Sequence, residues 1–312
     1  MEEQVALLME RGLTVSDKAV CAAFLAANNY YRFSGFARHF QRAPGEGENS
    51  FRAGTTFGEI RAIYEADEDF RAELGRPLTR IELLLRAHTA HVIAEQYGPC
   101  GQYLEEDFYT DFSGREPTVD RCIRDIQRSR ERHILHFMPD QDNPDFSDLP
   151  VWSAIEAWSF GTVSKCIERG ARGALQEAVA ASLGITKTGF ANRVRSFVYL
   201  RNRCAHHGRL WHHSIMDAGP TPAKVRTSAR KLVGQFDSRS VLDVIASLDD
   251  MLATNTNEEP MLPKLAAQHP QVSEFWQGLA RPRDSQSLPT PALQRPQEQS
   301  KNSLSVRPTR SI

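Results

Sequence analysis

The sequence predicts an all-α fold. Apolar residues recur at spacings of three and four in most segments, which is the period of an amphipathic helix. Segments in which apolar and polar residues alternate with a period of two between hairpin turns do not stand out. The chain has 312 residues, of which 40% are apolar and 25% charged, an ordinary globular composition. These observations exclude a collagen, a coiled-coil rod and a wholly disordered chain.

The first predicted helices are marked by residues that favour helix starts. One helix begins near Ser16 and Asp17, whose side chains can each accept a hydrogen bond from a free backbone N–H group, and ends at Asn28 and Asn29. Another begins at Thr56, where Glu59 completes the pattern of a capping box. We expect a loop rich in Gly and Pro at residues 43–49 between these helices.

The middle of the chain continues the helical pattern after one predicted break. Gly75 and Pro77 are expected to interrupt the helix, because proline removes a backbone donor and glycine weakens helical structure. The further helices that the apolar spacing predicts cover residues 78–98, 118–138, 150–163, 173–183, 188–206, 228–236 and 240–253. Residues 281–312 are rich in Pro, Ser and Gln and are predicted to be disordered. We therefore expect one helical domain at residues 1–280, followed by this tail.

Length and charge exclude several other classes of protein. No run approaches the roughly 18 apolar residues that a membrane span needs, and the acidic start differs from the basic start of a secretory signal. We expect a cytoplasmic protein that does not bind a membrane. The five cysteines lie far apart without a C-x-x-C pair, so neither a disulfide framework nor a zinc ribbon is predicted. A net charge of −1 excludes a protein that coats nucleic acid with its whole surface, but it permits a local basic site.

Such a basic segment lies at residues 178–216, which contain no Asp or Glu. Its cationic and titratable side chains are Lys187, Arg193, Arg195, Arg201, Arg203, Arg209, His206, His207, His212 and His213. On a helical wheel, Arg201 falls within an apolar stripe, with Asn202 and His206 together at its edge. An unpaired buried guanidinium costs several kcal/mol, so Arg201 is expected to meet a carboxylate or an external anion. The internal candidates are Glu82 and Glu156.

Three interpretations of this segment remain open. The first is a metal-independent ribonuclease site, in which histidine transfers protons and arginine stabilises the charge on the phosphorane. The second is a core arginine, Arg201, paired with Glu156 beside a solvated helix end. The third is a zinc site, although its ligand spacing is unfamiliar and the flanking arginines repel a dication. The ligands of that third site would be Cys204, His206, His207 and His212.

Four blocks of the sequence, spread in order over about residues 11–211, carry a resemblance to a known family. They are Arg201–Trp211 (R-N-R-C-A-H-H-G-R-L-W), Asn29–Gly35 (N-Y-Y-R-F-S-G), Arg80–Arg86 (R-I-E with a later R) and Leu149–Gly161 (L-P-V-W, I-E and S-F-G). Together they resemble the signature of the bacterial abortive-infection family (Abi-like, AbiD/AbiF). This family is placed in the HEPN superfamily, which has an R-x(4–6)-H motif.

The resemblance implies a HEPN-like helical bundle with additional helices, a role in phage defence or as a toxin-like protein, and RNA as the target. It implies that Arg201 and His206 are catalytic, with Asn202 as a polar companion and His207 as an alternative histidine. It also implies a homodimer in which two R-x4-H helices form one site. A non-coding RNA or an antitoxin is a further candidate partner.

The remaining expectations concern the surroundings of these residues. The candidate substrate-binding residues are Arg193, Arg195, Arg203 and Arg209, and the candidate supporting residues are Glu82 and Glu156. We expect neither a metal nor another cofactor. The alternatives to an endoribonuclease are a non-catalytic RNA-binding protein of the same family and a helical module that binds a protein partner.

Two further segments have a functional and a structural interpretation. RNA bases could stack on the aromatic residues of Tyr30–Phe33, but such residues at the end of a short helix more often form a core cluster, which is what we expect here. The arginines of the segment Arg121–Arg132 could follow a phosphate backbone. For them we expect a solvated helix face.

Overall fold

The computed structural model describes residues 1–138, 145–215, 219, 221–270 and 273–283. These residues confirm the predicted all-α class: they form fourteen α-helices and one small two-stranded sheet. Within this part of the chain, no helix is both long enough and apolar enough to cross a lipid bilayer. Most of the predicted tail, residues 284–312, lies outside the described residues.

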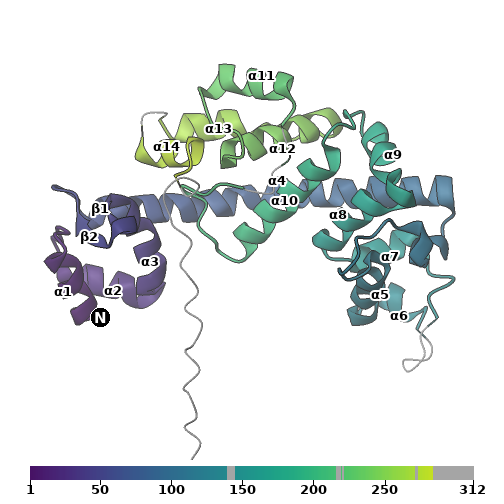
Figure 1. Cartoon of the computed structure of the whole chain (residues 1–312), viewed down its shortest axis with the longest axis horizontal. Coiled ribbons are helices and arrows are strands. Elements are labelled where there is room, and N and C mark those ends of the chain that lie inside the picture. Colours follow the sequence, from purple (N-terminus) through teal and green to yellow (C-terminus); the bar gives the residue numbers. More distant parts are fainter. Residues whose placement is uncertain (139–144, 216–218, 220, 271–272, 284–312) are drawn as a thin grey trace, which may run out of the picture.

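A single long helix, α4 (Phe57–Tyr97), forms the axis of the molecule (Figure 1). Its 41 residues correspond to a length of about 60 Å. Thr56 and Glu59 start the helix with the predicted capping box. The predicted break at Gly75 and Pro77 is wrong, because α4 continues through both residues.

The elements before α4 gather at one of its ends. They are α1 (Glu2–Glu10), α2 (Lys18–Asn28), α3 (Tyr30–Ala37), β1 (Gln41–Ala43) and β2 (Glu48–Phe51). The strands form an antiparallel hairpin in which Gln41 pairs with Phe51 and Ala43 with Glu48. The predicted loop at residues 43–49 is therefore partly a hairpin, which the short, charged strands did not reveal.

The opposite end of α4 is covered by the next group of helices. They are α5 (Thr118–Arg128), α6 (Arg132–Leu135), α7 (Val151–Ala157), α8 (Phe160–Arg169) and α9 (Leu175–Ser182). The predicted helix at 118–138 is thus two helices, and the predicted helix at 150–163 breaks at Trp158. Ser159 causes the second break by capping α8, where its hydroxyl accepts the N–H of Thr162 at 3.2 Å.

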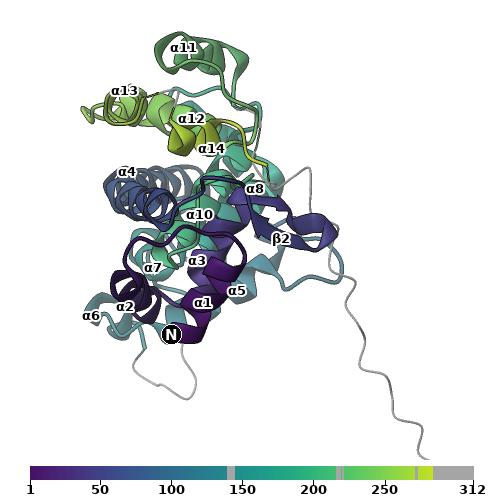
Figure 2. The ribbon, with the colours of Figure 1, turned by 90° about the vertical axis from the view of Figure 1, so that its left-hand side faces the viewer.

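The last helices complete the fold. They are α10 (Phe190–Ala205), α11 (Ala223–Val233), α12 (Val241–Asn255), α13 (Met261–Gln268) and α14 (Glu274–Ala280). Short 3₁₀ turns occur at Arg38–Phe40, Pro44–Glu46, Gln102–Leu104, Glu106–Phe108 and Ala171–Gly173. Figures 1 and 2 show α11–α14 on one side of α4, and the N-terminal elements together with α5–α7 on the other. Helix α10 packs against α4, α8 and α12.

Candidate functional site

Helix α10 carries the basic segment and is fixed by an apolar stripe. The stripe consists of Phe190, Val194, Phe197 and Leu200, which are completely buried. Its spacing of three and four residues places these side chains on one face of the helix. In Figure 1, the C-terminal end of α10 lies between the N-terminal elements and α5–α8. Of the predicted catalytic pair, Arg201 is partly exposed and His206 is exposed.

Arg201 meets Glu82 of α4 rather than Glu156. Its Nε lies 3.0 Å from Oε2 of Glu82, and its Nη2 lies 3.0 Å from Oε1 and 2.8 Å from Oε2. Its Nη1 donates to the side-chain oxygen of Asn202 at 3.1 Å, and the guanidinium lies 5.7 Å from the ring centroid of Phe160. Glu156 is exposed on α7. Arg201 thus meets an internal carboxylate, as expected, and that carboxylate comes from Glu82 of α4.

The Arg201 guanidinium keeps one side open although Glu82 holds the other. The side chain of Arg201 is 35% exposed, whereas that of Glu82 is 13% exposed. An arginine has five N–H groups, two of them on Nη1. Among the described residues, Asn202 is the acceptor for Nη1, so a second N–H on that nitrogen can bind an external oxygen. The geometry fixes the direction of the cation and still permits contact with an anion.

Glu82 also binds a second arginine from its own helix. Arg86 donates from Nη2 to Oε1 of Glu82 at 2.6 Å, and its Nη1 donates to the backbone carbonyl of Ile155. The group of Arg201, Arg86 and Glu82 therefore has a formal charge of +1. The side chains of Glu82 and Arg86 are largely shielded from solvent, which strengthens these interactions relative to a surface ion pair.

His206 and His207 lie at the end of α10 with exposed side chains. The N–H of His206 donates to the carbonyl of Asn202 at 2.9 Å and closes the last helical turn. The backbone then changes direction at His207, which has a φ of 56°. The carbonyl of His207 accepts a hydrogen bond of 2.7 Å from Arg32 of α3. Both residues are exposed to solvent.

Two predicted substrate-binding residues, Arg203 and Arg209, help to fold the turn after α10. Arg203 donates from Nη2 to the backbone carbonyl of Arg209 at 2.5 Å. A side chain at Gly208 would place its Cβ 3.1 Å from the Cζ of Arg203, so only glycine fits without adjustment. Arg209 contacts His39 and lies over the ring of Phe36. Both arginines are half-buried and hold the loop beside the predicted catalytic residues.

The other two predicted substrate-binding residues lie farther back along α10. Arg193 is 1% exposed and donates to the hydroxyl and carbonyl of Ser247, at 2.6 and 2.8 Å, and to Asp250 at 2.8 Å. Burial lowers the pKa of Arg193, and Asp250 opposes that shift. We assign Arg193 a packing role between α10 and α12 instead of the predicted contact with substrate. Arg195 pairs with Glu168 of α8 at the surface.

A buried carboxylate that the sequence analysis did not single out anchors the following residues. Asp67 of α4 is completely buried, and its Oδ1 accepts the backbone N–H groups of Leu210 at 3.0 Å and Trp211 at 2.7 Å. Its Oδ2 pairs with Arg71. The indole N–H of Trp211 donates to the carbonyl of Glu274 at 3.1 Å. The sequence signal that could have revealed Asp67 is its spacing from Arg71, because the two opposite charges lie one helical turn apart within an apolar stripe of α4.

The zinc interpretation has no set of ligands in the described part of the chain. Within these residues, no group of three or more His, Cys, Asp or Glu side chains could hold a metal ion. Burial raises the pKa of Cys204 to about 11, which opposes formation of the thiolate that zinc binds.

Comparison with known proteins identifies the family. The family model of Abi-like proteins matches residues 23–212, which is more than half of the chain. The chain belongs to the Abi-like family. The matched region contains Glu82, Asp67 and the complete segment from Arg201 to Trp211. No curated protein and no solved structure matches the chain. Membership in this family suggests a role in abortive infection, a form of phage defence.

Proposed function

We propose that this protein is a metal-independent endoribonuclease of the HEPN type that acts in phage defence. One observation carries the proposal: the Arg201 guanidinium is held by Glu82 but remains 35% exposed, and the exposed His206 follows five residues later on the same helix end. A fixed cation and an accessible imidazole at the same helix end are two of the groups that cleavage of RNA through its 2′-hydroxyl uses.

The proposed reaction is an internal transfer of the phosphodiester. His206 accepts the proton of the ribose 2′-hydroxyl as the 2′-oxygen forms its bond to phosphorus. The bond between phosphorus and the 5′-oxygen breaks, and a protonated histidine gives its proton to that oxygen. The products are a 2′,3′-cyclic phosphate and a 5′-hydroxyl. Arg201 binds the non-bridging oxygens, whose negative charge increases in the transition state, and Asn202 orients the guanidinium through its contact with Nη1.

The second part of the proposal is a homodimer, because the reaction also needs a proton donor for the 5′-oxygen. One chain supplies one Arg201 and, in the proposed role, one His206, whereas the reaction uses a base, an acid and a cation. A two-fold axis beside the end of α10 would bring two copies of each residue together. The two basic helix ends repel each other, so RNA between them should stabilise the dimer.

Substitution of the proposed residues tests this function directly. Arg201→Ala and His206→Ala should each reduce the rate of RNA cleavage by about 100-fold or more, with the far-UV circular dichroism unchanged. Arg172→Ala is the matched control, because Arg172 is an exposed arginine that pairs with Asp107 and lies in the turn between α8 and α9, outside the proposed site. Cleavage by purified His206→Ala protein at the wild-type rate would refute the assignment. RNA retention without any cleavage by the wild type would instead favour a non-catalytic RNA-binding protein.

A further inference from the structure

Tyr31 departs from the core cluster that the sequence predicts for Tyr30–Phe33. Phe33 is completely buried, as expected, but the side chain of Tyr31 is 83% exposed. This is the highest value among the exposed large hydrophobic side chains of the described residues. Helix α3 turns Phe33, Phe36 and Ala37 toward the core, and Tyr31 lies on its outer face. An aromatic ring in this position has an open face for a planar ligand.

The ring of Tyr31 is supported by its neighbours. Asn29 caps α3, and its side-chain oxygen accepts the N–H of Tyr31 at 2.9 Å. The hydroxyl of Ser34 donates to the carbonyl of Tyr31 at 2.9 Å. The ring of Tyr30 lies edge-on to that of Tyr31, with centroids 5.9 Å apart and an interplanar angle of 79°. These contacts fix the backbone of Tyr31, so binding to the ring does not require the backbone to become ordered.

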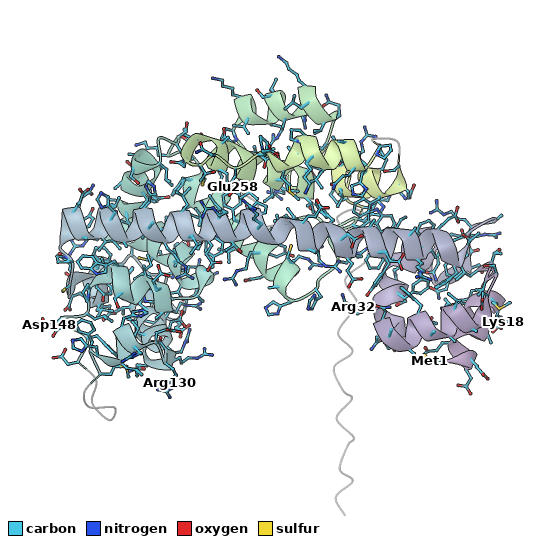
Figure 3. All side chains as sticks on the ribbon, turned by 180° about the vertical axis from the view of Figure 1, so that it is seen from behind. Met1, Lys18, Arg32, Arg130, Asp148 and Glu258 are labelled. Carbon is cyan, nitrogen blue, oxygen red and sulfur yellow. The ribbon has the colours of Figure 1, made fainter. Side chains whose placement is uncertain are left out.

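The next residue connects Tyr31 to the proposed catalytic site. Arg32 donates to the carbonyl of His207 at 2.7 Å, and its Nε lies 3.4 Å from the hydroxyl of Tyr64. Figure 3 places Arg32 at the edge of the N-terminal elements that faces the middle of the molecule. Tyr31 directly precedes Arg32, and consecutive Cα atoms are about 3.8 Å apart, so the backbone of Tyr31 lies next to a residue that contacts the turn after α10.

We propose that Tyr31 is a substrate-binding residue on which an unpaired RNA base next to the scissile phosphate stacks. The proposal rests on the proposed ribonuclease function and specifies its substrate class as single-stranded RNA or unpaired loops. In a duplex, neighbouring base pairs cover the faces of each base, whereas an unpaired base can be turned out onto an aromatic ring. Arg32 and Arg201 supply positive charge for the phosphates on either side.

A binding experiment separates this proposal from the catalytic one. The probe is a short single-stranded RNA containing the fluorescent base 2-aminopurine, and the proteins carry His206→Ala so that the RNA stays intact. In this background, Tyr31→Ala should weaken binding by about 5- to 150-fold and remove the fluorescence quenching, and Tyr31→Phe should retain both. Phe112→Ala is the control, because Phe112 is an exposed aromatic residue (59%) outside this site. Binding of a fully paired duplex should not depend on Tyr31.

Three results would overturn the proposal. The first is single-strand binding by Tyr31→Ala at wild-type affinity, and the second is an equal loss of single-strand and duplex binding. The third is dissociation of subunits by Tyr31→Ala in light scattering without a change in RNA affinity, which would make Tyr31 a protein contact. Quenching by the intact wild-type protein without cleavage would contradict the ribonuclease function alone. Absence of RNA binding by the wild type would contradict both.

Discussion

The carboxylate of Glu82 on α4 holds Arg201 on α10, with Oε2 2.8 Å from Nη2. The same carboxylate binds Arg86, with Oε1 2.6 Å from Nη2. Glu82 therefore links the longest helix of the fold to the basic end of α10. Its contacts with Nε and Nη2 fix the orientation of the Arg201 guanidinium, which remains partly exposed. We regard Glu82 as a positioning residue of the proposed site.

Glu82→Gln should lower kcat for RNA cleavage by about 10-fold or more, with a smaller effect on KM. A misdirected Arg201 can still attract the bound RNA, but it no longer lies where the negative charge develops in the transition state. The buried Arg86 also loses its counter-charge, so the free energy of unfolding should fall by about 1–3 kcal/mol. Glu258→Gln is a closely matched control, since Glu258 likewise binds two arginines of α4, Arg76 at 3.2 Å and Arg80 at 3.4 Å. Equal kinetic effects of the two substitutions would contradict a positioning role.

A mixture of inactive subunits tests the shared site of the homodimer. Arg201→Ala and His206→Ala proteins, each inactive alone, should recover part of the wild-type cleavage rate when they are combined, because a mixed dimer contains one intact residue of each kind. Cleavage rate against mixing ratio is the measurement, and light scattering with and without a short RNA follows the dimer. A wild-type protein that is an active monomer at every concentration would contradict this prediction.

Asp67→Asn should destabilise the protein by about 3–5 kcal/mol, since it leaves the buried Arg71 without its counter-charge. The amide also accepts fewer hydrogen bonds than the carboxylate that now binds Leu210 and Trp211. Urea unfolding measures the change. Glu65→Gln on the same helix is the control, because Glu65 forms an exposed pair with Arg61 at 2.8 Å and should contribute less than about 1 kcal/mol. A similar loss in both variants would contradict the anchoring role of Asp67.

Asp249 is expected to make stability depend on pH between about 4 and 6. Burial raises the pKa of Asp249 from 3.8 to about 6, although its oxygens accept the N–H groups of Met261 and Leu262. In this range the native state binds more protons than the unfolded state. The free energy of unfolding is therefore highest, with respect to Asp249, below pH 4 and falls as the pH rises to 6. The unfolding free energy of wild type minus that of Asp249→Asn should fall on the order of 3 kcal/mol across this interval. Parallel pH curves for the two proteins would show that the shift is absent.

The sequence predicted the helical class and α10 well, but it could not locate the interactions between helices. The period of the apolar residues placed Arg201 within an apolar stripe and predicted a carboxylate or an anion as its partner. The structure confirms the carboxylate, although the side chain of Arg201 is 35% exposed. Glu82 and Glu156 were equivalent candidates, because each borders an apolar stripe of its own helix. Only the packing of α10 on α4 distinguishes them, and that packing depends on contacts between residues more than one hundred positions apart.

Local signals also failed where tertiary packing outweighed them. Pro77 lacks a backbone donor, yet Leu74 and Leu78 on either side of it are buried, and their burial offsets the loss of one hydrogen bond. The hairpin and the short helices α1, α13 and α14 were missed for a different reason. Their strands and helices contain few residues, so no periodic pattern could develop before the chain turned.

The most direct test of the central claim is the chemistry of the RNA ends produced in the presence of EDTA. Purified wild-type protein should cleave single-stranded RNA at an unchanged rate after chelation, leaving 2′,3′-cyclic phosphate and 5′-hydroxyl ends, since the 2′-oxygen is the nucleophile. His206→Ala protein should leave the RNA intact under the same conditions. Loss of cleavage in EDTA, or products with 3′-hydroxyl and 5′-phosphate ends, would show that a metal-activated water is the nucleophile and would contradict the assignment of Arg201 and His206.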